Sequence, residues 1–205
     1  MKLRLDLHVH TANSKDAHTM PERVTSLCKA AGLDGLAITD HNFLSTITSD
    51  DVIIIPGIEV STRDGHLLGL GVSKAVPRGL SAEETITLIH AAGGIAIVAH
   101  PYDLLRSSIT PQRLSLRPDA IEVVNSASFL HSLSWRKAEK FAKLHGLPRT
   151  GGSDSHIPET LGRACTVIEA HSKETPSILA AIRNGDIQPE GVPIRLGDRL
   201  KKLCR

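Results

Sequence analysis

Short apolar segments that end in a histidine, a carboxylate or an asparagine recur along this 205-residue chain. They alternate with segments of helical character, and this order favours a parallel sheet or barrel with helices on its outside. The predicted strands are Leu3–His8, Gly35–Thr39, Val52–Ile58, Ile95–Ala99, Ala120–Val124, Pro148–Gly151 and Ala164–Ile168. The predicted helices are Pro21–Ala31, Ala82–Ala92, Ser134–His145 and Pro176–Asn184. In addition, the turn signal Asp64-Gly65 predicts a hairpin between Gly57–Thr62 and His66–Val72.

The polar residues at the strand ends are expected to lie together. In parallel α/β folds the carboxyl ends of all strands meet at one rim, where the chemistry of such folds is found. His8 and His10 are two apart on an extended segment, so both side chains point the same way. The other residues at these positions are Asp16, Asp40, His41, Glu59, His66, His100, Asn125, Asp154 and His156.

So many acidic and imidazole groups at one rim point to bound metal. Crowded carboxylates repel each other, and buried charges are costly unless they are paired or bind metal. Imidazole together with carboxylate, without thiolate, suits zinc, manganese or iron as divalent ions. The sequence therefore predicts a metal site, with Asp40 expected to support His41 or its loop rather than to bind metal itself.

Composition narrows the classes of partner. The net charge is +2, and one Trp, one Tyr and three Phe are too few for a base-stacking platform, so nucleic acid is expected only as a short oligonucleotide substrate. The apolar runs are far shorter than the roughly 18–20 residues of a membrane span, and we see no signal-peptide pattern at the N-terminus. Cys28, Cys165 and Cys204 suit a reducing compartment, so we expect a cytoplasmic protein. The sequence specifies no oligomeric state.

Six motifs in order resemble those of the PHP (polymerase and histidinol phosphatase) superfamily, in its compact prokaryotic type. They are DLHVHTANSKD, TDHN, PGIEVS, GHLLGLG, AHP and GGSDSH, which run from Asp6 to about Ala170. The resemblance implies an α/β fold, a distorted seven-stranded (β/α) barrel of the TIM-like kind. It also implies one PHP domain over residues 1–205, with a PHP-associated segment at about 150–190. Residues 191–205 are interpreted as a basic tail that is solvated or frayed, because Arg195–Arg205 holds five Lys or Arg against one Asp.

The resemblance further implies three divalent metal ions held by nine residues of this sequence. Carried over, the first ion takes His8, His10, Glu59 and Asp154. The second shares Glu59 and adds His66 and His100. The third takes Asp16, His41 and His156. All nine positions are filled by residues that can bind metal, so we expect an active metal site.

The activity implied is hydrolysis of a small phosphomonoester, or of a short nucleotide or oligonucleotide, by a metal-bridging hydroxide. Asp154 is expected to orient the hydroxide, and His156 or His18 to protonate the leaving group. The candidate substrate contacts are Arg106, Asn125 and His131. The chain lacks a long inserted lid of the kind that the resemblance associates with the nucleotide phosphatases of this family. The sequence therefore does not specify which phosphoester is the substrate.

Two other classes of function are kept as alternatives. A non-phosphate metallohydrolase of the amidohydrolase type would use a similar barrel, although no predicted strand here ends in a lysine. An RNA-binding barrel like a ribonuclease P subunit would have a degraded ligand set and a more basic surface than this chain has.

Overall fold

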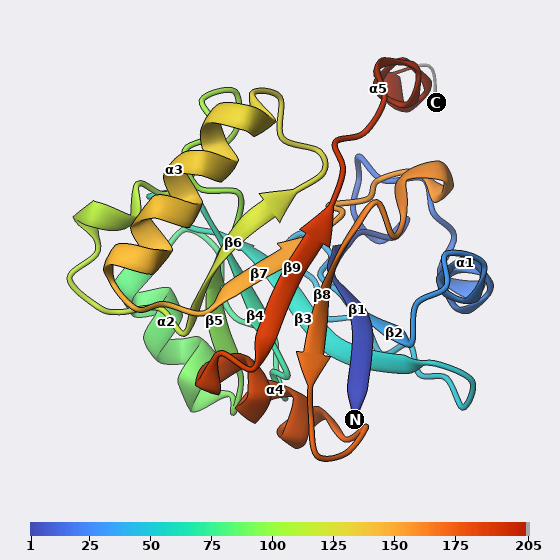
Figure 1. Cartoon of the computed structure of the whole chain (residues 1–205), viewed down its shortest axis with the longest axis horizontal. Helices are drawn as coiled ribbons and strands as arrows, with labels where there is room; N and C mark the ends of the chain where they lie inside the picture. Colours follow the sequence, from blue (N-terminus) through green and yellow to red (C-terminus); the bar gives the residue numbers. More distant parts are fainter. Residues whose placement is uncertain (204–205) are drawn as a thin grey trace.

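The computed structural model describes residues 1–203, and Cys204 and Arg205, the end of the predicted basic tail, lie outside the described residues. The described residues form one sheet in the order β7-β6-β5-β4-β3-β2-β1-β8-β9, with helices packed around it (Figure 1). The strands are β1 (Lys2–Val9), β2 (Gly35–Ile38), β3 (Ile53–Ser61), β4 (His66–Leu70), β5 (Ile95–Val98), β6 (Ala120–Asn125), β7 (Arg149–Gly152), β8 (Ala164–Glu169) and β9 (Ile187–Gly191).

The helices lie outside and at the two ends of this sheet. They are α1 (Val24–Ala30), α2 (Ala82–Ala91), α3 (His131–Leu144), α4 (Thr175–Asn184) and α5 (Leu196–Leu203), with short 3-10 turns at Pro21–Arg23, Pro111–Arg113 and Pro158–Thr160. In Figure 1, α2 and α3 lie on one side of the sheet and α1 on the other. Helix α4 lies near the N-terminus, and α5 lies at the opposite end. None of the helices in residues 1–203 combines the length and apolar character that crossing a bilayer requires.

Strand direction decides which ends of the strands meet. β1, β2 and β3 are parallel to one another, and so are β5, β6 and β7. β4 runs antiparallel between β3 and β5, so it begins where its two neighbours end. The ends of β1, β2, β3, β5, β6 and β7, together with the start of β4, therefore form one edge, which we call the carboxyl rim. The expected α/β barrel-like fold with outer helices is confirmed.

The expected number of seven strands is wrong, because the described sheet has nine. The hairpin signal anticipated β4, which returns along β3 from His66. β9 was not anticipated, because its sequence IQPEG contains a proline and a glycine and no apolar run. It pairs only with β8, and an edge strand of this kind tolerates a proline where a central strand would lose a ladder hydrogen bond. Within the predicted basic tail, residues 196–203 form α5.

The sheet curves until β7 approaches β1 and β8, so the barrel is nearly closed. Gly151 N donates to Thr166 Oγ1 at 2.8 Å across the gap between β7 and β8. Beyond the ends of the strands, Asp154 N donates to His8 O at 2.7 Å, and His10 N donates to Ser155 O at 2.9 Å. These bonds join the first and seventh strands at the carboxyl rim.

Asp6 is a buried carboxylate that holds this closure. It accepts hydrogen bonds from the backbone N–H of Ser153 at 2.8 Å, of Gly162 at 2.9 Å and of His8 at 3.3 Å. Burial raises the pKa of Asp6 to about 6, and these hydrogen bonds oppose the rise. One side chain thus connects β1 to the two segments that follow β7.

We expect Asp6→Ala to lower the free energy of unfolding by about 3 kcal/mol, because buried backbone donors lose their acceptor. Urea titration followed by circular dichroism measures the change. The control is Asp186→Ala, which removes an exposed carboxylate between α4 and β9 and is expected to change stability by less than about 0.5 kcal/mol. Equal stability of the Asp6 variant and the unchanged protein would contradict the role of Asp6 in closing the barrel.

Candidate metal centre

Glu59 occupies the middle of a group of imidazoles at the carboxyl rim. Its side chain is about 1% exposed, and it lies in the part of β3 that pairs with β4. Its Oε1 lies 2.9 Å from His66 Nδ1 and 3.1 Å from His100 Nε2. Its Oε2 lies 3.0 Å from His41 Nδ1, 3.2 Å from His10 Nε2 and 3.4 Å from His8 Nε2. Five of the predicted ligands therefore converge on the sixth.

Asp154 and Asp16 complete the group. Asp154 Oδ1 lies 3.6 Å from His8 Nε2, 3.4 Å from His10 Nε2 and 3.4 Å from His156 Nδ1. Asp16 Oδ2 lies 2.9 Å from His156 Nε2. The carboxylate of Asp16 is half exposed, whereas that of Asp154 is buried. The structure therefore places all nine predicted metal ligands at one rim.

The backbone departs from regular geometry at this rim. The pairing of β1 with β2 shifts register between Asp6 and Val9, and the pairing of β6 with β7 shifts between Glu122 and Val124. His100 and Asp154 have positive φ angles of 29° and 52°, a region that residues with a Cβ rarely adopt. Such bulges and strained residues gather at functional sites, where they aim a side chain that regular geometry would direct elsewhere.

Four of the histidines have one ring nitrogen held by an oxygen, which leaves the other facing the centre. The pairs are His8 Nδ1 with Glu122 Oε1 at 2.9 Å, His10 Nδ1 with Ser14 Oγ at 3.3 Å, His100 Nδ1 with Ser108 Oγ at 3.3 Å and His156 Nδ1 with Asp154 O at 2.9 Å. Metal-binding histidines characteristically have such a partner, which fixes the ring orientation and the tautomer.

Glu122 is a functional residue that the sequence reasoning missed. It is buried in β6, and besides His8 it accepts hydrogen bonds from His100 N at 2.7 Å and from Asn125 Nδ2 at 2.9 Å. The available signal was an acidic residue inside the otherwise apolar run AIEVV. A buried carboxylate in such a strand needs partners, and here the partners are groups that orient two predicted metal ligands.

The expected role of Asp40 agrees with its contacts. Its carboxylate accepts hydrogen bonds from Thr11 N at 2.6 Å, Thr11 Oγ1 at 2.7 Å and Ser14 Oγ at 3.0 Å. Ser14 Oγ in turn accepts a hydrogen bond from His41 N at 2.9 Å. Asp40 thus fixes the loop after β1 and, through Ser14, the backbone of His41.

The buried carboxylates of the group are held in their ionised form by the cationic groups around them. Burial by itself raises the pKa values of Glu59 and Asp154, but the imidazoles around Glu59, and Arg106 with His8 beside Asp154, bring both pKa values well below their usual range. Burial likewise opposes protonation of His8, yet Asp154, Glu122 and Glu59 raise its pKa. The carboxylates therefore stay ionised and draw cations to themselves.

Divalent metal ions fit this arrangement. Asp154 Oδ1 is buried and makes no hydrogen bond, although three ring nitrogens surround it. His8 Nε2 and His10 Nε2 lie only 3.1 Å apart, close to the roughly 3.3 Å expected for two nitrogens about 2.0–2.1 Å from one tetrahedral zinc ion. Three sets have ligand atoms within 4.8 Å of one another: His8, His10 and Glu59; His41, Glu59 and His66; and His10, His41 and His156.

These three sets share more residues with one another than the three predicted ligand groups do. His41 Nδ1 lies 3.0 Å from Glu59 Oε2, whereas His41 Nε2 lies 3.8 Å from Asp16 Oδ1. His41 thus stands between the residues predicted for the second ion and those predicted for the third. The rings of His10 and His156 have centroids 4.3 Å apart, so the first and third groups are also adjacent.

The predicted substrate residues occupy different environments. Arg106 forms an ion pair with Asp154 and lines the cavity above the centre. Asn125 is buried, and its amide donates to Glu122 Oε2 at 2.9 Å and to Asp154 Oδ2 at 3.0 Å. Its oxygen accepts a hydrogen bond from Ala127 N at 3.0 Å. Asn125 therefore orients Asp154.

Two other predicted residues lie at the margin of the centre. His131 begins α3 and makes an edge contact with Trp135, with 5.5 Å between the ring centroids. His18 is half-buried, and its backbone N donates to His156 O at 2.7 Å. Within residues 1–203, the lining of the cavity described below includes neither of these two histidines.

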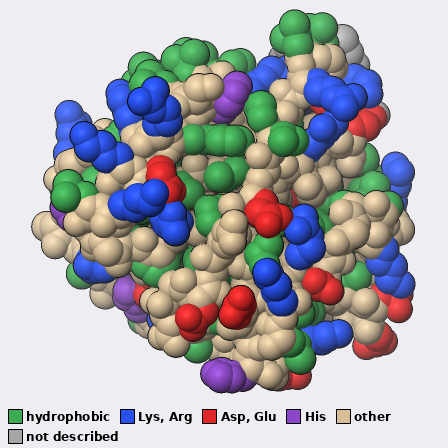
Figure 2. Space-filling view, viewed as in Figure 1, with side chains coloured by type: hydrophobic (Ala, Val, Ile, Leu, Met, Phe, Trp, Pro, Cys, Tyr) green, Lys and Arg blue, Asp and Glu red, His purple; other side chains and the backbone are tan. Residues whose placement is uncertain are grey.

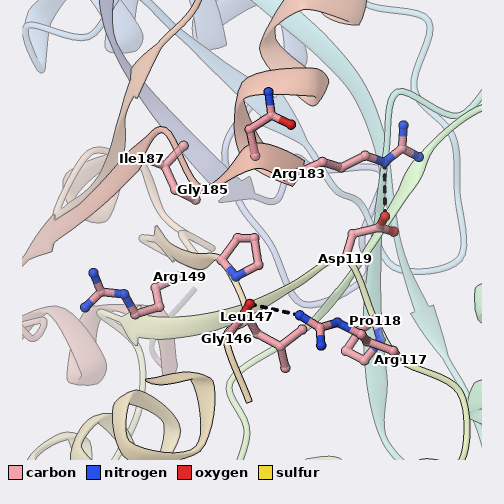
Figure 3. Close-up of a pocket in the computed structure, with 11 residues that line it drawn as sticks. Arg117, Pro118, Asp119, Gly146, Leu147, Arg149, Arg183, Gly185 and Ile187 are labelled. Carbon is pink, nitrogen blue, oxygen red and sulfur yellow. Dashed lines mark hydrogen bonds and ion pairs between the residues drawn. The ribbon is translucent and has the colours of Figure 1, made fainter. Parts of the chain in front are cut away.

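A cavity of about 560 Å³ opens above the metal centre. Asp16, His41, His66, Asp154 and His156 line its floor. Another hollow, of about 420 Å³, is lined by residues of the turns that precede β6 and β7 and follow α4, at the end of the strands away from the carboxyl rim (Figure 3). Its basic groups are engaged with protein atoms: Arg183 Nε donates to Asp119 Oδ1 at 3.0 Å and Arg117 to Gly146 O at 2.8 Å. Predicted metal ligands therefore line the cavity at the carboxyl rim and not this second hollow.

Fold and site together define a class, the α/β-barrel proteins with a metal centre of imidazoles and carboxylates. A family model described as PHP-associated matches residues 133–187, from α3 to the start of β9. The chain is 31% identical over 141 residues to the uncharacterized protein MJ1587 of Methanocaldococcus jannaschii, a match that covers 60% of this chain and 82% of that protein.

Two further comparisons concern proteins with descriptive names. The chain is 34% identical over 105 residues to a 3',5'-nucleoside bisphosphate phosphatase of Chromobacterium violaceum, which covers 50% of this chain and 35% of that protein. A two-domain protein of Bacteroides vulgatus, containing a predicted PHP-like metal-dependent phosphoesterase, superposes with a TM-score of 0.70 at 18% identity, over 100% of this chain and 69% of that one. The chain belongs to the PHP superfamily.

Proposed function

We propose that this chain is a metal-dependent phosphoesterase that hydrolyses a small phosphomonoester, with three divalent cations held by the nine residues at the carboxyl rim. The observation that carries the proposal is Glu59, a buried carboxylate whose two oxygens face five imidazoles. One carboxylate between several imidazoles suits a bridge between cations. Family membership and the similarity to a bisphosphate phosphatase support the same reaction class.

The chemistry of the proposed reaction divides between the cations and the chain. Divalent cations, when bound, would lower the pKa of a coordinated water and neutralise the charge that develops on the phosphate oxygens. Arg106 lies in the cavity beside Asp154, where its guanidinium would bind two phosphate oxygens at once. Asp154, held in place by Asn125, would orient the attacking water.

The two candidates for donating a proton to the leaving oxygen are His156 and His18. His156 Nδ1 is held by the carbonyl of Asp154, so its Nε2 is the atom that faces Asp16 and the cavity floor. Burial, with His10 nearby, lowers the pKa of His156 below its ordinary value, which disfavours the charged ring and leaves Nε2 free to bind a cation.

The test is removal and return of metal. We expect EDTA treatment followed by dialysis to abolish the hydrolysis of p-nitrophenyl phosphate, and added Mn²⁺ or Zn²⁺ to restore it, because the proposed nucleophile forms only with cations bound. Metal content by mass spectrometry and nitrophenolate release are measured on the same samples. Mock dialysis without EDTA is the control, and metal-free protein of full activity would overturn the proposal.

The same preparation separates the two alternative functions. Metal-loaded protein that cleaves lactones or cyclic amides, and no phosphoester, would identify a hydrolase of the amidohydrolase type. Metal-free protein that co-purifies with RNA would identify an RNA-binding barrel. Bis-p-nitrophenyl phosphate, assayed in parallel, distinguishes a diesterase acting on short oligonucleotides from a monoesterase.

A further inference from the structure

Helix α5 lies at the end of the molecule opposite α4 (Figure 1), and its residues contribute to the lining of the cavity above the metal centre. The segment before it is attached by Val192 N, which donates to Arg163 O, and by Ile194 N, which donates to Ser126 O, both at 2.9 Å. The helix therefore has a defined position after β9.

Two side chains of α5 attach it to opposite sides of the cavity. Arg199 donates to Ala127 O at 3.0 Å and to Ser128 O at 2.8 Å, in the loop after β6. Lys202 Nζ lies 3.0 Å from Asp16 Oδ2, in the loop after β1. The helix thus crosses the cavity between the loops after two different strands.

Two leucines of α5 line this cavity. Leu196 and Leu200 are one helical turn apart and lie on the same face of the helix, and both line the cavity. They are 73% and 55% exposed, so a large part of each side chain is in contact with solvent. Phe129 and Leu105, which are 52% and 66% exposed, line the same cavity. Figure 2 shows apolar side chains beside basic ones over α5.

The cavity has more room and more apolar surface than a phosphate group requires. A volume of about 560 Å³ lies in the range of pockets that hold whole organic ligands, which are lined mainly by apolar groups with a few polar ones. The floor at the metal centre is polar, whereas Leu105, Phe129, Leu196 and Leu200 give the wall apolar surface beside the charged residues Asp198, Arg199 and Lys202 of α5. Arg199 stacks on the Phe129 ring, with its guanidinium carbon 4.3 Å from the ring centroid, so the ring is held in place at the wall.

We propose that Leu196 and Leu200 of α5, together with Phe129, form a leaving-group subsite that binds an apolar ring carried by the phosphoester substrate. This assignment rests on the proposed phosphoesterase function. With the phosphate at the carboxyl rim, the part of the substrate beyond the ester oxygen extends toward α5. An apolar ring there removes leucine and phenylalanine surface from water, which favours ring-bearing esters over polar or very small ones.

The test compares two phosphoesters in which the same kind of bond breaks. 2-Phenylethyl phosphate and ethyl phosphate both release a primary alcohol, and the ring is the main difference between them. We expect the metal-loaded protein to show a kcat/KM about tenfold or more higher for the phenylethyl ester. The double variant Leu196→Ala/Leu200→Ala is expected to lose most of that preference, mainly through a higher KM for the phenylethyl ester.

The matched control is Leu144→Ala, an equally exposed leucine at the end of α3 that does not line the cavity. It is expected to keep the full preference. Thermal melting of all variants checks the fold, and since the substituted leucines are exposed, unchanged melting temperatures are expected.

The outcomes separate the two proposals. A kcat/KM ratio near one in the unchanged protein, or a ratio that survives the double substitution, overturns the subsite while leaving the phosphoesterase function intact. No turnover of either ester by protein with bound metal overturns the phosphoesterase function, and the subsite with it. A loss of preference confined to the α5 variant supports the assignment.

Discussion

The variant Glu59→Gln is expected to lose bound metal and nearly all phosphoester hydrolysis. Glu59 Oε1 faces His66 and His100, and its Oε2 faces His8, His10 and His41, so every set of ligands except the one around Asp16 depends on it. In glutamine one of these oxygens becomes an amide nitrogen, which donates hydrogen bonds and does not bind a cation. The negative charge that bridges the imidazoles is lost as well.

The expected size of this effect follows from the chemistry of metal sites. Substitution of residues that merely support a ligand costs about 10–100-fold in metal affinity or activity. Loss of a bridging ligand should exceed that range, so we expect kcat/KM to fall by more than about 100-fold. Metal content after reconstitution should fall below that of the unchanged protein.

The experiment measures metal stoichiometry by mass spectrometry and phosphate release on the same preparation. The control is Glu169→Gln, which makes the same substitution at an exposed end of β8. It is expected to bind metal and turn over substrate like the unchanged protein. Full metal content and full activity in the Glu59 variant would refute the central position of this carboxylate.

The second large effect is expected from Glu122→Gln, which touches no predicted substrate atom. Glu122 Oε1 lies 2.9 Å from His8 Nδ1, and its Oε2 accepts hydrogen bonds from His100 N and from Asn125 Nδ2. A glutamine can accept with only one of its two terminal atoms. If the amide nitrogen takes the place of Oε2, it faces the two N–H donors. If it takes the place of Oε1, His8 Nδ1 loses the acceptor that fixes the tautomer of the ring.

We expect metal affinity and kcat/KM of this variant each to fall about 10–100-fold, with the fold retained. Competition with a chromogenic chelator gives the affinity, and circular dichroism checks the fold. A positioning role predicts that activity recovers partly at high metal concentration, because the ligands are intact but less well oriented. Unchanged chelator competition would show that His8 does not need Glu122, and Glu169→Gln serves again as the control.

The gathering of the predicted metal ligands at one rim could be predicted because it depends on a local rule. Most of them lie at or just beyond the end of an apolar strand, and strand ends of an α/β fold share a rim whatever the details of packing. His8 and Glu59 are examples: both lie where an apolar run ends, and both reach the same centre in the structure. The strand alternation also predicted the barrel-like sheet, but not β9, because an edge strand with proline and glycine lacks the apolar pattern.

The supporting residues could not be predicted in the same way. Glu122 and Asp6 are single carboxylates inside apolar strands, and nothing in their neighbours along the chain identifies what they contact. Asp6 bonds to Gly162 and Ser153, which are about 150 positions away in sequence. Contacts over such separations depend on how the sheet curves and where its register shifts.

The amino-acid sequence alone determined the strand alternation, the residue types at the strand ends and so the expectation of a metal centre, because these follow from local periodicity and the shared rim of parallel strands. The tertiary structure alone decided that Glu122 orients His8, that Asp6 closes the barrel and that α5 crosses the cavity. The physical reason is that the role of a buried carboxylate or an amphipathic helix depends on the groups it contacts. Folding brings those groups together from distant parts of the chain.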